Sequence, residues 1–241
     1  MNRKTRLTQI FIGGMVVAAI ATTTYASVAS HNLHLGYALV LLALAAATSR
    51  MKIKLPGIDG NMSVNLPFLL MAVVNLSAPE AVVIACVSTA VQCWPKQGGK
   101  FKPEQMLFNI SMMAFATSAA NLIWHAGAGN LGWASEPPML GSATAAFFLG
   151  QTAPVAGVIK LAEGVAMRRV WLSIVQLSFP YYILSAGLTS ITNVVSHHFG
   201  WQAALLAFPV MYVVHRSYRL YFRTAEAVPA GSLARAAAAS A

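Results

Sequence analysis

The apolar run from Val64 to Trp94 constrains the fold of this chain more than any other feature. It reads "VNLPFLLMAVVNLSAPEAVVIACVSTAVQCW". As one straight α-helix it would be about 46 Å long, against a bilayer hydrocarbon core of about 30 Å. The stretch "SAPE" matches the S-x-x-E capping box, in which Ser77 caps a new helix and Glu80 reaches back to it. Pro79 costs no intrahelical hydrogen bond in a first helical turn. The run therefore predicts a hairpin of two short helices.

Each arm of this hairpin is shorter than a membrane crossing, which needs about twenty residues. The hairpin over 64–94 therefore either crosses a thinned region of the bilayer or is re-entrant, with its tip lining a cavity. The preceding stretch "KLPGIDGNMSVNLP" contains two prolines and two glycines and predicts irregular backbone. Such a segment at membrane depth must be buried in protein or reached by water.

Composition places the rest of the chain in the membrane as well. Of the 241 residues, 57% are hydrophobic and 9% are charged, whereas a soluble domain carries about 25% charged residues. We expect an all-α, polytopic transmembrane helical bundle of about eight membrane segments. These segments cover residues 8–29, 34–48, 64–77, 79–94, 105–124, 139–161, 170–194 and 200–215.

Basic residues lie in alternate connections between these segments. They precede the first segment and follow the second, fourth, sixth and eighth, while the other connections hold no Lys or Arg. The positive-inside rule then puts both termini in the cytoplasm, as in a bacterial inner-membrane protein. The net charge of +10 is thus explained by loops facing anionic lipid. The lipid bilayer is the expected partner and nucleic acid is not.

The sequence predicts one transmembrane domain over 1–222, followed by an Ala-rich cytoplasmic tail or linker over 223–241. The N-terminus combines a basic start, an apolar stretch and the small-residue sequence "ASVAS", so it is either a cleaved signal peptide or a first membrane helix. The apolar stretch has transmembrane length, which favours an uncleaved helix. Cys86 and Cys93 lie seven residues apart on one helix and are too distant for a disulfide.

Polar residues near the predicted outer ends of adjacent segments form the candidate ligand site. Polar side chains are costly inside a membrane and often have a function there. We expect one outward-facing pocket for a small molecule of unknown identity, rimmed by Asn75, Glu80, Asn121, Trp124 and His125. For each single amide the alternative is a hydrogen bond to a neighbouring helix.

Histidines on the outer side are weak candidates for a metal or proton site. His31, His34, His197 and His198 come from two outer loops, but their spacing matches no metal signature. Histidine also suits a membrane interface without any further role. We expect no metal, no cofactor and no enzymatic activity, because the sequence holds no Walker loop, G-x-S-x-G, H-E-x-x-H or CxxC motif.

Two parts of the sequence resemble the N-terminal membrane region of bacterial cyclic-di-GMP signalling proteins. The first is "SRMKIKLPGIDGNMSVNLPFLLMAVVNLSAPEAVVIACVSTAVQCW" with "QMLFNISMMAFATSAANLIWH", and the second is "VVHRSYRLYFR". In those proteins a multi-helix sensor region precedes an HD-GYP or GGDEF effector domain. Neither effector motif is present here. The resemblance implies a sensor module whose exit helix contacts a cytoplasmic signalling partner through Arg216, Arg219 and Arg223.

The short-helix hairpin is also similar in architecture to the substrate-binding membrane component of energy-coupling-factor transporters. That likeness implies docking on transporter subunits, but only at the level of fold. The expected function is therefore a non-catalytic sensory module that binds a small ligand near the outer face and signals through the C-terminal exit helix. A small-solute transport component and an accessory subunit of a membrane complex remain the alternatives.

Overall fold

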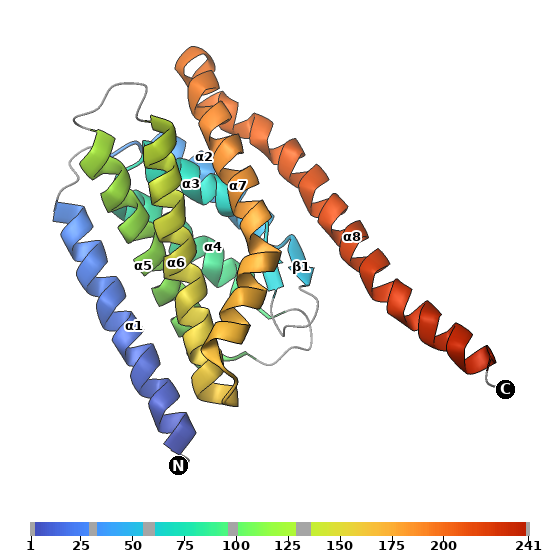
Figure 1. Ribbon diagram of the computed structural model, residues 1–241. Coiled ribbons are helices and arrows are strands. Elements are labelled where there is room, and N and C mark those ends of the chain that lie inside the picture. Colours follow the sequence, from blue (N-terminus) through green and yellow to red (C-terminus); the bar gives the residue numbers. More distant parts are fainter. Residues whose placement is uncertain (1–2, 29–32, 55–60, 96–100, 129–135, 240–241) are drawn as a thin grey trace.

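The computed structural model describes residues 3–28, 33–54, 61–95, 101–128 and 136–239. Eight α-helices and one short pair of strands make up this part of the chain (Figure 1). The elements in chain order are α1 (Arg3–Val28), α2 (Leu35–Ser49), β1 (Lys52–Lys54), β2 (Asn61–Ser63), α3 (Leu66–Asn75), α4 (Ala78–Cys93), α5 (Pro103–Ala128), α6 (Glu136–Glu163), α7 (Met167–Phe199), the 3-10 turn η2 (Gly200–Gln202) and α8 (Ala203–Ala239). The predicted all-α helical bundle is confirmed.

Four of these helices are long and apolar enough to cross a membrane. They are Thr5–Val28 of α1, Pro103–Ala126 of α5, Glu136–Glu163 of α6 and Met167–Ser196 of α7. The apolar helices α2, α3 and α4 are shorter than a crossing. Large apolar side chains such as Ile10, Val17 and Ile183 stand exposed on the outside of the long helices. These features are those of a membrane protein, in which such side chains face lipid rather than water. The number of crossings and their orientation stay predictions.

Helix α3 occupies the centre of the bundle. Every residue from Leu66 to Val74 is buried, and the helix packs against α2, α4, α5 and α7. A helix that is apolar all round is stable only when it is enclosed on all sides. The central position of α3 therefore follows from its composition, and it puts α3 in contact with these four surrounding helices.

Strands β1 and β2 form an antiparallel pair. Strand β1 ends at the first residue of the stretch for which the sequence predicted irregular backbone, and β2 lies within that stretch. Lys52 pairs with Ser63, Ile53 with Met62 and Lys54 with Asn61. Three residues per strand are too few for a periodic pattern to be read from the sequence. The pair places Ile53 and Ser63 in buried positions at the base of the α3–α4 hairpin.

Close helix contacts in the bundle depend on small residues. A Cβ atom added to Gly150 of α6 would lie 3.0 Å from the Cα of Ala116 on α5. The hydroxyls of Thr23 on α1 and Ser118 on α5 are 3.0 Å apart. Backbones that approach this closely gain dispersion and polar contacts that lipid cannot replace.

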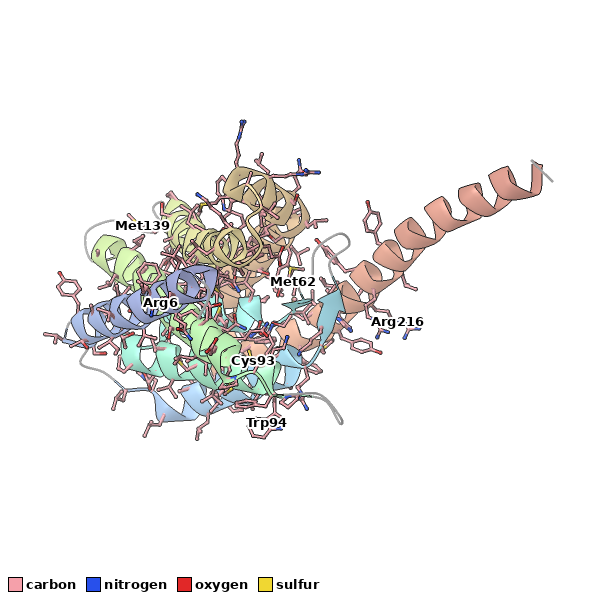
Figure 2. The ribbon with its side chains drawn as sticks, turned by 90° about the horizontal axis from the view of Figure 1, so that it is seen from below. Arg6, Met62, Cys93, Trp94, Met139 and Arg216 are labelled. Atoms are coloured by element: carbon pink, nitrogen blue, oxygen red, sulfur yellow. The ribbon has the colours of Figure 1, made fainter. Side chains whose placement is uncertain are left out.

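Helix α8 leaves the bundle and extends away from it, as Figure 1 shows in orange and red. The same view places the start of α1 and the α6–α7 connection at the lower end, opposite the α7–α8 connection. In Figure 2, seen from below, Arg216 lies on α8 beyond the strands. The predicted boundary between domain and tail, at residue 223, falls inside α8, which continues to Ala239.

Candidate functional site

The turn between α3 and α4 carries the predicted capping box. The backbone N–H of Ser77 donates to Oε2 of Glu80 at 3.1 Å, and the Ser77 hydroxyl donates to the same oxygen at 2.6 Å. Both halves of the box are present. The predicted hairpin, its break at "SAPE" and the role of Glu80 in that break are therefore confirmed.

The same carboxylate also joins the hairpin to a third helix. Oε1 of Glu80 accepts a hydrogen bond from the backbone N–H of His34 at 2.7 Å, and His34 precedes the first residue of α2. Glu80 is only 8% exposed. Hydrogen bonds to an ionised group are stronger than neutral ones, so a single buried carboxylate fixes the tip of the hairpin to the start of α2.

Asn121 and Trp124 of α5 hold the other side of the tip. The Asn121 amide donates to the carbonyls of Val73 at 3.0 Å and Leu76 at 3.3 Å. The Trp124 indole N–H donates to the carbonyl of Val74 at 3.0 Å. The last carbonyls of a helix have no partner within it, and here two α5 side chains supply those partners for α3. Both side chains are buried.

We call Asn75, Glu80, Asn121 and Trp124 the tip cluster, because the structure gathers all four around the α3–α4 turn. Asn75 is partly buried and its amide donates to the carbonyl of Met71 within α3. His125 is exposed beside the cluster. The hydrogen bonds of the cluster are internal, which gives each residue a structural role. The ligand-binding role of these five residues stays a prediction.

A second polar cluster, which we call the base cluster, lies at the opposite end of α3. It consists of Ser63, Asn65, Ser88 and Gln92. The Ser63 hydroxyl lies 2.7 Å from Oδ1 of Asn65 and 3.1 Å from Oε1 of Gln92. The Asn65 amide reaches the Ser88 hydroxyl at 3.5 Å. The sequence signal for this cluster is the four-residue spacing of Ser88 and Gln92 on α4, which puts both on one face of the helix.

Tyr181 connects the start of α3 to α7. Its hydroxyl accepts a hydrogen bond from the backbone N–H of Leu66 at 3.1 Å, and its side chain is 1% exposed. Further along α7, the Thr189 hydroxyl donates to the carbonyl of Pro67 at 3.3 Å. Side chains of neighbouring helices thus satisfy the backbone at both ends of α3. No local sequence pattern predicts these contacts, since the partners lie more than a hundred residues apart.

Side-chain hydrogen bonds join α6 to α7. The Tyr182 hydroxyl donates to Oε1 of Gln151, whose amide lies 3.4 Å from the sulfur of Met113. The Trp171 indole N–H donates to the Thr152 hydroxyl at 3.2 Å. These pairs give the intramembrane amide Gln151 a helix-packing role.

The described residues hold no group of three or more His, Cys, Asp or Glu side chains arranged to bind a metal. His34 and His198 are exposed. His31 and the side chain of His197 lie outside the described part of the chain, so the weak metal prediction at these four histidines is not tested. Cys86 and Cys93 are free thiols, as expected.

The predicted partner contact lies on α8. Arg216 and Arg219 are exposed, while the side chain of Arg223 lies outside the described residues. At the base of the hairpin, Arg50 donates to the carbonyls of Val91 at 3.1 Å and Trp94 at 3.4 Å. A cation at this position complements the negative end of the α4 dipole.

Comparison of the chain with protein-family models, with curated proteins and with solved structures found no match in any of the three.

Proposed function

We propose that this chain is a non-catalytic membrane sensory module that binds a small ligand at the tip cluster and signals through α8. The proposal rests on one observation: α3 is a short, buried helix whose two ends form hydrogen bonds with side chains of neighbouring helices. Asn121 and Trp124 hold its carbonyl end, and Tyr181 holds its amide end. A change at the tip cluster therefore has a direct route to α7.

The route continues from α7 to the exit helix. Both α3 and α7 pack against α8, and α8 then extends away from the bundle (Figure 2). Its residues Arg216 and Arg219 are exposed. Packed cores switch between discrete arrangements more readily than they deform continuously. A shift of α3 along its axis would therefore reach α8 as a change in its docking, which an attached partner could detect.

The test is to purify the tagged chain in mild detergent from its native membranes and to identify co-purifying proteins by mass spectrometry. A stoichiometric cyclase, phosphodiesterase or kinase supports the sensory function. The double variant Arg216→Ala/Arg219→Ala should then lose this partner. The matched control is Arg168→Ala/Arg169→Ala, two exposed arginines at the start of α7, which should retain it.

A transport component is the second candidate, and the short α3–α4 hairpin favours it. Its arms have 10 and 16 residues, and half-length helices that end beside buried polar side chains are typical of transporter binding sites. The base cluster supplies such side chains at the start of α3. A co-purifying ATPase pair would support transport and overturn the sensory proposal.

A further inference from the structure

Helix α8 attaches to the bundle along one narrow stripe. Ala204, Ala207, Met211 and His215 are spaced three or four residues apart and are all buried. Along this side α8 packs against α7, α2, α3 and β1. His215 ends the stripe, and it is the member that can change its charge near neutral pH.

The imidazole of His215 is buried, and in the described part of the chain one of its two ring nitrogens has no hydrogen-bond partner. The residue is 9% exposed, and among the described atoms its Nδ1 has no hydrogen-bond partner. A neutral imidazole tolerates such a site far better than an imidazolium does, because a buried charge without a partner is very costly.

Among the side chains that the structure describes, the elements packed around His215 carry basic and phenolic groups and no carboxylate. Helix α3 and η2 contribute no titratable side chain. The described groups on the other elements are Tyr37 on α2, Lys52 on β1, Arg168, Arg169, Tyr181, Tyr182 and His198 on α7, and Tyr212, Arg216, Tyr218, Arg219 and Tyr221 on α8. His215 itself lies outside the four long apolar helices. Burial, and then the nearby Arg219 guanidinium, lower the pKa of His215 below its ordinary value of 6.5.

We propose that protonation of His215 releases the exit helix from the bundle, so that α8 responds to acidification. The neutral imidazole fits the docked helix, whereas the released helix lets the imidazole bind a proton in water. Docking is therefore complete above the ordinary histidine pKa and weakens as the pH falls below it, by up to about tenfold per pH unit. The interpretation of this movement as a signal rests on the proposed function. The pH-dependent movement of α8 itself does not depend on that function.

The experiment measures the distance between spin labels on α2 and α8 in lipid nanodiscs from pH 8 to pH 5. Labels are attached to cysteines replacing the exposed Leu39 and Ser217, in a background carrying Cys86→Ser and Cys93→Ser. The parent should show one distance at pH 8 and a growing population of longer distances below about pH 6.5. His215→Gln stays neutral and should keep the short distance at every pH.

Two further variants complete the test. His215→Arg carries a permanent charge and should show the longer distances even at pH 8. Arg168→Gln/Arg169→Gln removes two exposed charges at the start of α7 and should leave the pH response unchanged. A parent distance that is constant from pH 8 to pH 5 overturns the proposal, as does an undiminished response in His215→Gln. Co-purification of an ATPase pair would overturn the proposed sensory function but would leave these distances unaffected. Failure of the proposed function can therefore be told apart from failure of the His215 proposal.

Discussion

Replacing Glu80 by alanine tests the central structural argument, that one buried carboxylate fixes the tip of the hairpin. The carboxylate accepts hydrogen bonds from the Ser77 backbone, the Ser77 hydroxyl and the His34 backbone at 3.1, 2.6 and 2.7 Å. Glu80→Ala leaves two backbone N–H groups without their acceptor. An unsatisfied buried donor costs about 1–3 kcal/mol, and the N–H of the exposed His34 costs less, so we expect a loss of about 2–4 kcal/mol in the free energy of unfolding.

Glu80→Gln removes the charge of the side chain and keeps its shape. The glutamine keeps one acceptor oxygen but replaces the second with an NH₂ group. On that side the NH₂ group faces an N–H group, and two donors cannot form a hydrogen bond. We expect a loss of about 1.5–3 kcal/mol, between the parent and the alanine variant. The assay is reversible unfolding in mixed micelles with a denaturing detergent, followed by circular dichroism.

The matched control is Glu104→Ala. Glu104 also lies in the first turn of a helix, but it is exposed and its contact with Gln9 is a long 3.4 Å. We expect its effect to stay within about 0.5 kcal/mol, as at most surface positions. If Glu80→Ala proved as mild as this control, the carboxylate would not hold the tip and the reasoning would be refuted.

Two further predictions concern the packing of α6 and the start of α3. Gly150→Val should destabilise the bundle by about 1–3 kcal/mol, because its side chain meets the α5 backbone at Ala116; Gly141→Val, with open space around its Cβ, is the control. An equal effect of the two valines in detergent unfolding would contradict the close α5–α6 contact. Tyr181→Phe should cost about 1–2 kcal/mol, because the Leu66 N–H loses its acceptor; the same assay checks it, and Tyr25→Phe on an exposed part of α1 should be neutral.

Local patterns explain why much of the fold could be predicted. The position and residues of the "SAPE" break were predicted correctly, because a capping box is formed by residues three apart and depends on little else. The helical segments followed from runs of apolar residues. The strands β1 and β2 could not be predicted this way, since each is three residues long and depends on its partner for hydrogen bonds.

The structure brings residues of the predicted site together, but no sequence pattern revealed the hydrogen bonds that they make. Asn75, Glu80, Asn121 and Trp124 were expected near one another because they lie at corresponding ends of adjacent segments, and they do gather around one turn. That Asn121 and Trp124 bond to the last carbonyls of α3 was not predictable. An amide in a membrane helix has the same sequence signal whether it binds a ligand or a neighbouring backbone.

The sequence by itself determined that this chain is a helical membrane protein whose long central run must turn at Ser77. Hydrophobicity and capping are properties of neighbouring residues, so they can be read along the chain. Only the tertiary structure decided that α3 is enclosed, that Tyr181 meets Leu66 and that Nδ1 of His215 is buried without a hydrogen-bond partner among the residues that the structure describes. Those outcomes depend on groups far apart in sequence, and only the packing of the whole bundle brings such groups within a hydrogen bond of each other.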